Sequence, residues 1–271
     1  MTLFVIFAFI IGAIIGSFVN VVAMRYNTGS SFVAGRSRCP NCNVPLKWYE
    51  LIPVLSFVFS GGKCLSCGSK ISWQYPLIEI SSGIIFVLLF LRQAALLSFY
   101  GMAYSWIFFV YYAFVFSLLL VILLYDFHHK IIPNSLVYVF AFLAVLKLAL
   151  FFYIRPPLGA LDYVDLLSPV ILFAFIFILW FVSRGRWIGL GDAKLAFGIG
   201  ALLGFVLGIS GLVLAFWIGA VFGIVYLIFK KSSGASGQSQ IPFAPFLIVA
   251  TFIVFFTHID VLRLGAFLNY L

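Results

Sequence analysis

Two short segments of the chain carry aspartates in settings that could support acid–base chemistry. The stretch Gly189-Leu190-Gly191-Asp192-Ala193-Lys194 places a carboxylate at the start of an apolar segment, beside glycines that allow close approach of another backbone. A second aspartate, Asp126, ends another apolar segment and is followed by two histidines and a lysine. A carboxylate in or beside hydrocarbon is costly, so each of these acids is a candidate functional residue.

Together, Asp126 and Asp192 could form a hydrolytic pair. Two close carboxyl groups cannot both ionise easily, so one keeps a proton while the other acts as a base. The base activates a water molecule, and the acid protonates the carbonyl oxygen or the leaving amine of a peptide bond. The alternative is local pairing, in which Asp126 meets the neighbouring histidines or lysine and Asp192 serves as a helix-start charge or meets Lys194.

The four cysteines form a second group of chemistry-bearing residues. They lie in two Cys-x-x-Cys segments separated by 21 residues: Cys39, Cys42, Cys64 and Cys67. Four thiolates complete the tetrahedral shell of a structural zinc ion and leave no open position for catalysis. The spacing therefore predicts structural zinc. Redox-active thiols and a reduced, metal-free loop are the alternatives.

The sequence lacks the motifs that other hydrolytic mechanisms require. The sequence contains no His-Glu-x-x-His segment for a metalloprotease and no Gly-x-Ser-x-Gly segment with a matching histidine. Adjacent His128 and His129 would point apart on a helix and make a poor pair of metal ligands.

Composition defines the class of protein that must position these residues. The chain is 65% hydrophobic and 20% aromatic, contains 34 Phe and has a mean hydropathy of +1.23. Soluble domains are only about 45–50% apolar. These values predict an all-α polytopic protein in a lipid bilayer. The net charge of +9 does not indicate a nucleic-acid partner, because basic residues gather in the cytoplasmic loops of membrane proteins.

Apolar runs predict about eight transmembrane helices. A polar insertion, residues 25–75, separates the first helix, residues 1–24, from a transmembrane domain, residues 76–271, that holds both aspartates. The apolar runs cover approximately residues 3–24, 76–91, 102–125, 135–153, 166–182, 195–207, 211–229 and 246–257. The polar residues between 154 and 165, including Asp162 and Asp165, are expected to form a loop.

Basic residues give the orientation of this bundle. With eight spans, the segments 25–75, 126–134, 183–194 and 230–241 share one side and carry twelve of the 16 Lys and Arg. The positive-inside rule makes that side cytoplasmic. Asp126 and Asp192 then both lie at cytoplasmic ends of helices. In the first span, Gly12, Gly16 and Ser17 predict close helix packing, and Asn20 predicts an interhelical hydrogen bond, with a substrate contact as the alternative.

These segments together resemble the type IV prepilin peptidases, also called prepilin leader peptidase/N-methyltransferases, of the Gly-x-Gly-Asp aspartic protease group. The similarity covers nearly the whole chain, with Asp126 followed by Ile132-Pro133 as the first catalytic motif and Gly189–Leu195 as the second. Two departures are Asn134, where the family often has Asp, and Ala244, where Gly is frequent. Further matching segments are Gly16–Val22, Cys39–Cys42, Tyr49–Ser56, Gly62–Cys67, Tyr75–Glu79 and Ile241–Phe246.

The resemblance implies a bacterial inner-membrane enzyme whose active site faces the cytoplasm. Such enzymes remove the basic leader of prepilins and pseudopilins for type IV pili or type II secretion. Many then methylate the new N-terminus with S-adenosylmethionine. It implies that Asp126 and Asp192 are catalytic and that the four cysteines belong to a zinc-type cytoplasmic domain. Glu79 is expected to be a helix-start charge, or else a contact for the basic leader.

Two other functions stay open at this point. The chain could be a peptidase without methyltransferase activity. It could also be a non-catalytic membrane assembly or transport protein that uses its acids as a proton relay.

Overall fold

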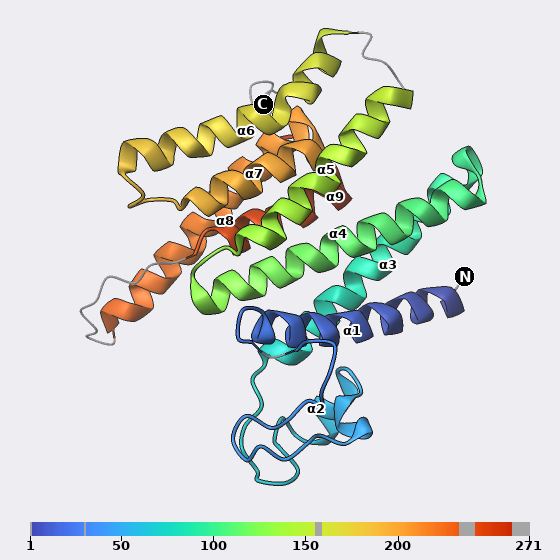
Figure 1. The fold of residues 1–271 in the computed structure, drawn as a ribbon, viewed down its shortest axis with the longest axis vertical. Coiled ribbons are helices and arrows are strands. Elements are labelled where there is room, and N and C mark those ends of the chain that lie inside the picture. Colours follow the sequence, from blue (N-terminus) through green and yellow to red (C-terminus); the bar gives the residue numbers. More distant parts are fainter. Residues whose placement is uncertain (1, 30, 155–158, 233–241, 262–271) are drawn as a thin grey trace, which may run out of the picture. The chain divides into compact units, whose positions relative to one another are not determined.

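The computed structural model describes residues 2–29, 31–154, 159–232 and 242–261, and these are almost entirely helical, with no strand among them. Each of the eight expected spans is a helix (Figure 1). The elements are α1 (Thr2–Arg25), the 3₁₀ helix η1 (Trp48–Leu51), α2 (Leu55–Phe59), α3 (Gln74–Tyr100), α4 (Met102–His129), α5 (Asn134–Ile154), α6 (Ala160–Ser183), α7 (Leu190–Leu203), α8 (Phe205–Ser232) and α9 (Ala244–Thr257).

Six of these helices are long and apolar enough to cross a bilayer: α1, α3, α4, α5, α6 and α8. The protein is therefore an all-α polytopic membrane protein with a cysteine-bearing insertion between its first two spans. The other two expected spans, α7 and α9, are 14 residues each. At 1.5 Å per residue they measure about 21 Å, short of the roughly 30 Å hydrocarbon core.

The chain forms two compact units, residues 1–124 and 125–271. In the first unit, α1 packs along α3 through small residues. A Cβ on Gly16 would lie 2.8 Å from the Cβ of Ser82 and 2.9 Å from the Cα of Glu79. One turn further along α1, Asn20 Nδ2 donates to the Tyr75 carbonyl at 3.4 Å. Both the close packing and the interhelical hydrogen bond predicted for this span are confirmed.

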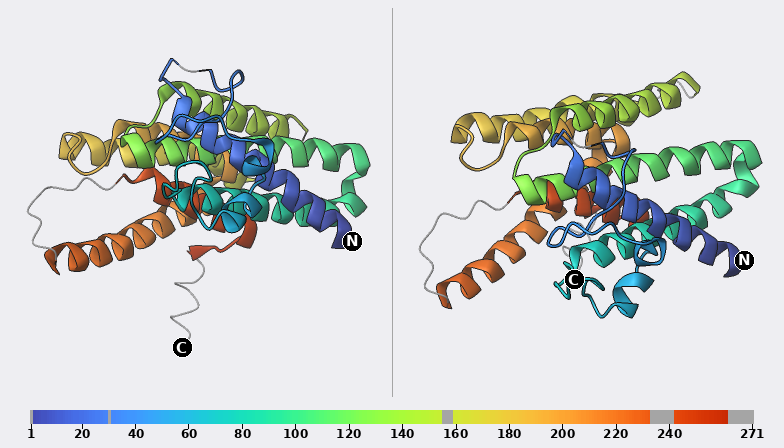
Figure 2. Two further views of the ribbon diagram at one scale, coloured as in Figure 1. Left: turned by 90° about the horizontal axis from the view of Figure 1, so that it is seen from below. Right: turned by 60° about the horizontal axis from the view of Figure 1, so that its bottom comes forward.

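The insertion between α1 and α3 contains turns, two isolated β-bridges, η1 and α2 (Figure 2). It is tied to α3 by Glu79, whose Oε2 accepts the Val54 N–H at 2.7 Å. Glu79 lies in the second turn of α3 and not at its N-cap, which is Trp73. The expectation of a helix-start charge is therefore wrong, because the carboxylate stabilises the backbone of the insertion instead.

In the second unit, α7 lies against α5, α6, α8 and α9 (Figure 1). Nine of its 14 residues are buried, including Asp192. Glycines make this close packing possible, since a Cβ on Gly200 would lie 2.7 Å from the Ser168 carbonyl of α6. The helix that carries Asp192 in its first turn thus packs against four other helices of the unit.

The loop expected up to residue 165 is shorter than predicted. Helix α6 begins at Ala160, so Asp162 and Asp165 lie in its first two turns. Asp162 Oδ2 accepts the Gly159 N–H at 3.2 Å, and Asp165 Oδ1 accepts the Phe205 N–H at 2.7 Å. Asp165 therefore caps the start of α8. Of the Ile241–Phe246 segment, Ile241 lies outside the described residues.

Candidate active site and thiol cluster

Asp126 lies in the last turn of α4 and is only 4% exposed. Its carbonyl accepts the Lys130 N–H at 2.7 Å, and Lys130 has a left-handed φ of 55° that ends the helix. The carboxyl oxygen Oδ2 is buried and has no hydrogen-bond partner in the described part of the chain. A buried carboxyl oxygen without a partner is costly, so this position is not explained by helix capping.

Asp192 lies in the first turn of α7 and is 6% exposed. Its Oδ2 accepts the Gly189 N–H at 3.0 Å, as in a capping box. Its other oxygen, Oδ1, is buried without a hydrogen-bond partner among the described residues. Each of the two aspartates therefore keeps one buried oxygen that the surrounding protein does not satisfy.

The fold brings these two acids together from positions 66 residues apart. Both belong to the unit of residues 125–271, and their carboxyl groups are near enough to interact electrostatically. Next to them, the chain after α4 packs closely on the start of α7. A Cβ added to Gly191 would lie only 2.9 Å from the Cβ of Ile132. Lys194 of α7 donates to Asn134 Oδ1 at 2.8 Å and to the Tyr138 hydroxyl at 3.1 Å, both on α5.

Of the local alternative, the helix-start role of Asp192 is present as its contact with the Gly189 N–H, but the local ion pairs are not present in the part of the chain that the structure describes. Lys194 contacts α5, not Asp192. The ring of His129 stacks on Tyr125, and its Nδ1 lies 3.1 Å from the Tyr125 carbonyl. Within the described residues, neither Asp126 nor Asp192 forms an ion pair with a basic side chain. What remains is two buried carboxyl groups, each with one oxygen that no described residue satisfies.

The thiol cluster belongs to the insertion and is built by two similar turns. The Asn43 N–H donates to the Cys39 carbonyl at 2.9 Å, and the Gly68 N–H donates to the Cys64 carbonyl at 2.8 Å. Asn43 and Gly68 both have positive φ, of 56° and 70°. The four Sγ atoms of Cys39, Cys42, Cys64 and Cys67 all lie within 4.8 Å of one another.

These thiols form no disulfide, and they could hold a metal ion. Hydrogen bonds from the Ser69 hydroxyl and its backbone N–H lower the pKa of Cys67 to about 6. The backbone N–H groups of Cys42 and Asn41 lower the pKa of Cys39. For Cys42, the Val44 N–H lowers the pKa, but desolvation and the other thiols outweigh it and raise the value to about 11.

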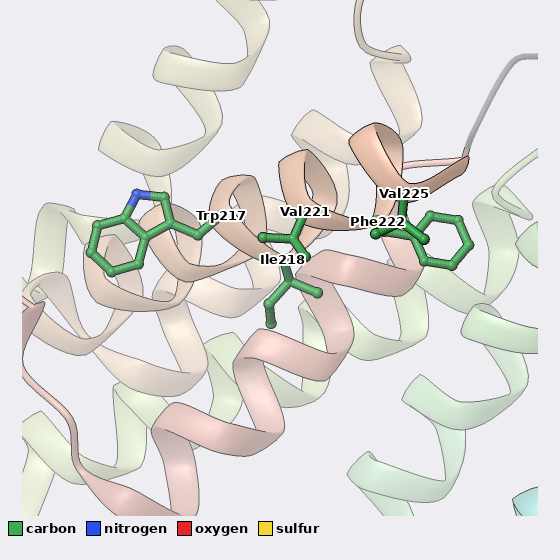
Figure 3. Close-up of a pocket in the computed structure, with 5 residues that line it drawn as sticks. All are labelled: Trp217, Ile218, Val221, Phe222 and Val225. Carbon is green, nitrogen blue, oxygen red and sulfur yellow. The ribbon is translucent and has the colours of Figure 1, made fainter. Parts of the chain in front are cut away.

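A third feature of the surface is apolar and carries no chemistry. Five side chains of α8 line a shallow hollow of about 420 Å³ with no polar surface (Figure 3). The second half of this helix, from residue 217 to 229, is mostly exposed, with Trp217 and Val221 at 57% and 64%. A face of this kind suits lipid chains or another apolar helix and cannot hydrolyse a bond. The residues are Trp217, Ile218, Val221, Phe222 and Val225.

Two family models match this chain, one in its N-terminal third and one in the region that follows. Residues 10–93 match the Bacterial Peptidase A24 N-terminal domain, and residues 113–228 match the Type IV leader peptidase family. The second match contains both aspartates, and the first contains the four cysteines.

Individual proteins named prepilin leader peptidase/N-methyltransferase are also similar. The protein of Bacillus subtilis is 34% identical over 242 residues, which is 88% of each chain. That of Myxococcus xanthus is 35% identical over 74% of this chain and 56% of its own. That of Vibrio cholerae is 27% identical over 92% of this chain and 94% of its own. No solved structure matches.

Proposed function

The chain belongs to the type IV leader peptidase family, and from this premise we propose that it cleaves the basic leader from prepilins and pseudopilins at the cytoplasmic face of the inner membrane. The observation that carries the proposal is the buried pair of Asp126 and Asp192, each with one carboxyl oxygen that has no hydrogen-bond partner in the described structure. Such oxygens can accept a proton from water and donate one to the substrate.

In the proposed mechanism the pair shares one proton. The ionised carboxylate takes a proton from a water molecule as that water attacks the scissile carbonyl carbon. The protonated carboxyl group donates to the carbonyl oxygen and later to the leaving amine. The Gly189 N–H, which donates to Asp192 Oδ2, holds this carboxyl group in one orientation. No nucleophilic side chain or metal ion takes part in these steps.

Orientation in the membrane supports the choice of substrate. The segments that join α1 to α3, α4 to α5 and α6 to α7 carry eight of the 16 Lys and Arg, and Arg25 and Lys194 lie at helix ends beside them, which favours the cytoplasm. Asp126 and Asp192 lie at the two helix ends next to the latter two segments. A substrate with an apolar helix in the bilayer and a basic leader in the cytoplasm would place its scissile bond at this depth.

We also propose that Cys39, Cys42, Cys64 and Cys67 hold a structural zinc ion. Tetrahedral zinc with bonds of about 2.3 Å places its sulfur ligands about 3.8 Å apart. The Cys39 and Cys67 Sγ atoms lie 3.9 Å apart. A bound ion would supply cross-links between the two cysteine turns, which stabilise an insertion with little buried core of its own.

Methyl transfer to the new N-terminus forms the second half of the proposal. It is supported by the names of the similar proteins from B. subtilis, M. xanthus and V. cholerae. S-adenosylmethionine would be the second substrate and the source of the methyl group. A peptidase without this second step, and a transport protein with a proton relay, are the competing functions.

Incubation of the purified full chain with a leader-bearing prepilin and S-adenosylmethionine tests these functions in one measurement. Intact-mass spectrometry separates the precursor, the cleaved product and the cleaved, methylated product. We expect the third species to accumulate. Cleavage without methylation would leave only the peptidase. An unchanged precursor, together with proton-dependent flux in liposomes, would favour the transport protein.

A further inference from the structure

Residues 1–124 contain one buried acid, and hydrolysis by the aspartate pair gives it no role. This part of the chain has only two acidic residues, Glu50 and Glu79, and no histidine. Glu50 is partly exposed, and its Oε2 accepts the Lys47 N–H at 2.8 Å at the start of η1. Glu79 is 7% exposed, on a helix that spans the membrane. Such a residue is a functional candidate whose partner must be identified.

The described neighbours of Glu79 include no cation. Its Oε2 accepts the Val54 N–H, and the Ser17 side chain lies close to the carboxyl group. No ion pair joins it to a Lys or Arg in the described residues, although the chain has a net charge of +9. A buried carboxyl group requires a positive partner to stay ionised and otherwise keeps its proton. One N–H donor and one hydroxyl leave that requirement unmet.

A second buried acceptor without a partner among the described residues lies in the same α1–α3 interface. Asn20 is 1% exposed, and its Nδ2 donates to the carbonyls of Gly16 and Tyr75. Its Oδ1 is buried and has no hydrogen-bond partner in the described part of the chain. A Cβ added to Gly16 would lie 2.9 Å from the Cα of Glu79, and Tyr75 lies one turn before Glu79 on α3. The carboxylate and the amide oxygen therefore share one section of the α1–α3 interface.

The backbone next to this section is held in an unusual conformation. Val54, whose N–H binds Glu79, has φ 63° and ψ −52°. A β-branched residue rarely adopts positive φ, and such residues persist where the surroundings fix them, often at functional sites. The hydrogen bond from Val54 to Glu79 thus holds the Glu79 carboxyl group in place as well as the backbone of the insertion.

From these contacts we propose that Glu79 and Asn20 bind a primary ammonium group, the new N-terminus of a processed pilin, and that Glu79 removes its proton before methylation. This inference rests on the methyl-transfer half of the proposed function. An ammonium group has only donors, and the site offers a carboxylate and an amide oxygen to receive them.

The chemical step balances with a sulfonium methyl donor. Glu79 accepts one proton from the ammonium group, which leaves a neutral amine with a free electron pair. That pair forms the new N–C bond to the methyl carbon while the C–S bond breaks, and its electrons go to sulfur. The products are a protonated methylamine and a neutral thioether.

Glu79→Gln tests the proposal with the Val54 contact preserved, because the amide oxygen of Gln can still accept that N–H. We expect cleavage at the wild-type rate and methyl transfer slower by about 100-fold or more, the usual contribution of a general base. Glu50→Gln, the other acid of this part of the chain, should methylate normally. Normal methylation by Glu79→Gln would overturn the proposal and leave Glu79 as a structural contact.

A binding measurement keeps this test separate from the proposed activity. Peptides with the sequence of a mature pilin N-terminus, with a free or an acetylated amine, are titrated into the full-length protein without methyl donor. The wild type should prefer the free amine, and Glu79→Gln should lose about tenfold in affinity for that peptide alone. Equal preference in both proteins would overturn the site, even if the wild type methylates.

The methyl donor also carries an amino group, so the same titration is run with S-adenosylhomocysteine. An effect of Glu79→Gln on this ligand alone would assign the ammonium site to the donor and overturn the assignment to the pilin N-terminus. A wild type that cleaves without methylating, yet prefers the free amine, would support the site while the methyl-transfer half of the proposed function fails.

Discussion

The aspartate pair and the thiol cluster are two polar sites built in opposite ways. Asp126 and Asp192 come from helix ends 66 residues apart and are both buried, each with an oxygen that no described residue satisfies. The cysteines come from two turns that each close on themselves through backbone hydrogen bonds, and Cys67 is exposed. Unsatisfied buried atoms are what the proposed reaction with another molecule requires, whereas self-closing turns fit the proposed role of stabilising the loop itself.

Substitution of either aspartate should have the largest effect on leader cleavage. Asp126→Asn and Asp192→Asn each leave a side chain of the same shape that can neither take nor hold the shared proton. We expect leader cleavage to fall by about 10²–10⁴-fold or more. Intact-mass measurement of a prepilin treated with each purified variant gives the rate.

The structure provides a matched control for Asp192. Asp162 has the same position in the first turn of α6, and its Oδ2 accepts a glycine N–H as that of Asp192 does. Asp162→Asn therefore removes the same capping charge and should leave cleavage within about fivefold of the wild type, because a cap contributes only about 1 kcal/mol. If Asp162→Asn and Asp192→Asn lost equal amounts of cleavage activity, Asp192 would act only as a capping residue.

Loss of a cysteine should affect metal content before it affects cleavage. Cys64→Ser removes a buried ligand, and we expect about one zinc per chain in the wild type and almost none in this variant, since structural sites need all four ligands. Ser66→Ala, within the same turn, is the control. Elemental analysis and thermal unfolding of the detergent-solubilised proteins measure both effects. Full zinc occupancy in Cys64→Ser would contradict the four-thiolate site.

Sequence reasoning located the helices and placed both aspartates at helix ends, because apolar runs and the polar segments between them follow the physics of the bilayer directly. It missed contacts that depend on packing between distant segments. The start of α6 at Ala160 and the capping of α8 by Asp165 are examples. The alternative in which Lys194 pairs with the nearby Asp192 is not observed, because Lys194 reaches Asn134 and Tyr138 on α5. Nothing in the local sequence signals such partners.

Close packing beside the aspartates can be tested at Gly191. A Cβ there would lie 2.9 Å from the Ile132 Cβ, so Gly191→Ala should push α7 away from the chain that follows Asp126. Overpacking costs about 1–3 kcal/mol, and displaced catalytic groups cost about 10- to 100-fold in rate. Gly223→Ala, on α8 with no atom within 4 Å of the added carbon, should keep full activity. Wild-type cleavage by Gly191→Ala would show that this contact does not position the pair.

The smallest effect is expected from Asn134→Asp, which introduces the residue that similar enzymes often have at this position. Its Oδ1 accepts the Lys194 Nζ at 2.8 Å near the surface, so the substitution turns a neutral hydrogen bond into an exposed ion pair. Such pairs contribute about 0–1 kcal/mol, and cleavage should stay within about fivefold of the wild type. The effect should disappear in a Lys194→Met background, because the new charge then has no partner. A much larger loss that survives in that background would mean that residue 134 acts on the aspartates themselves, through a charge that raises the cost of ionising the pair.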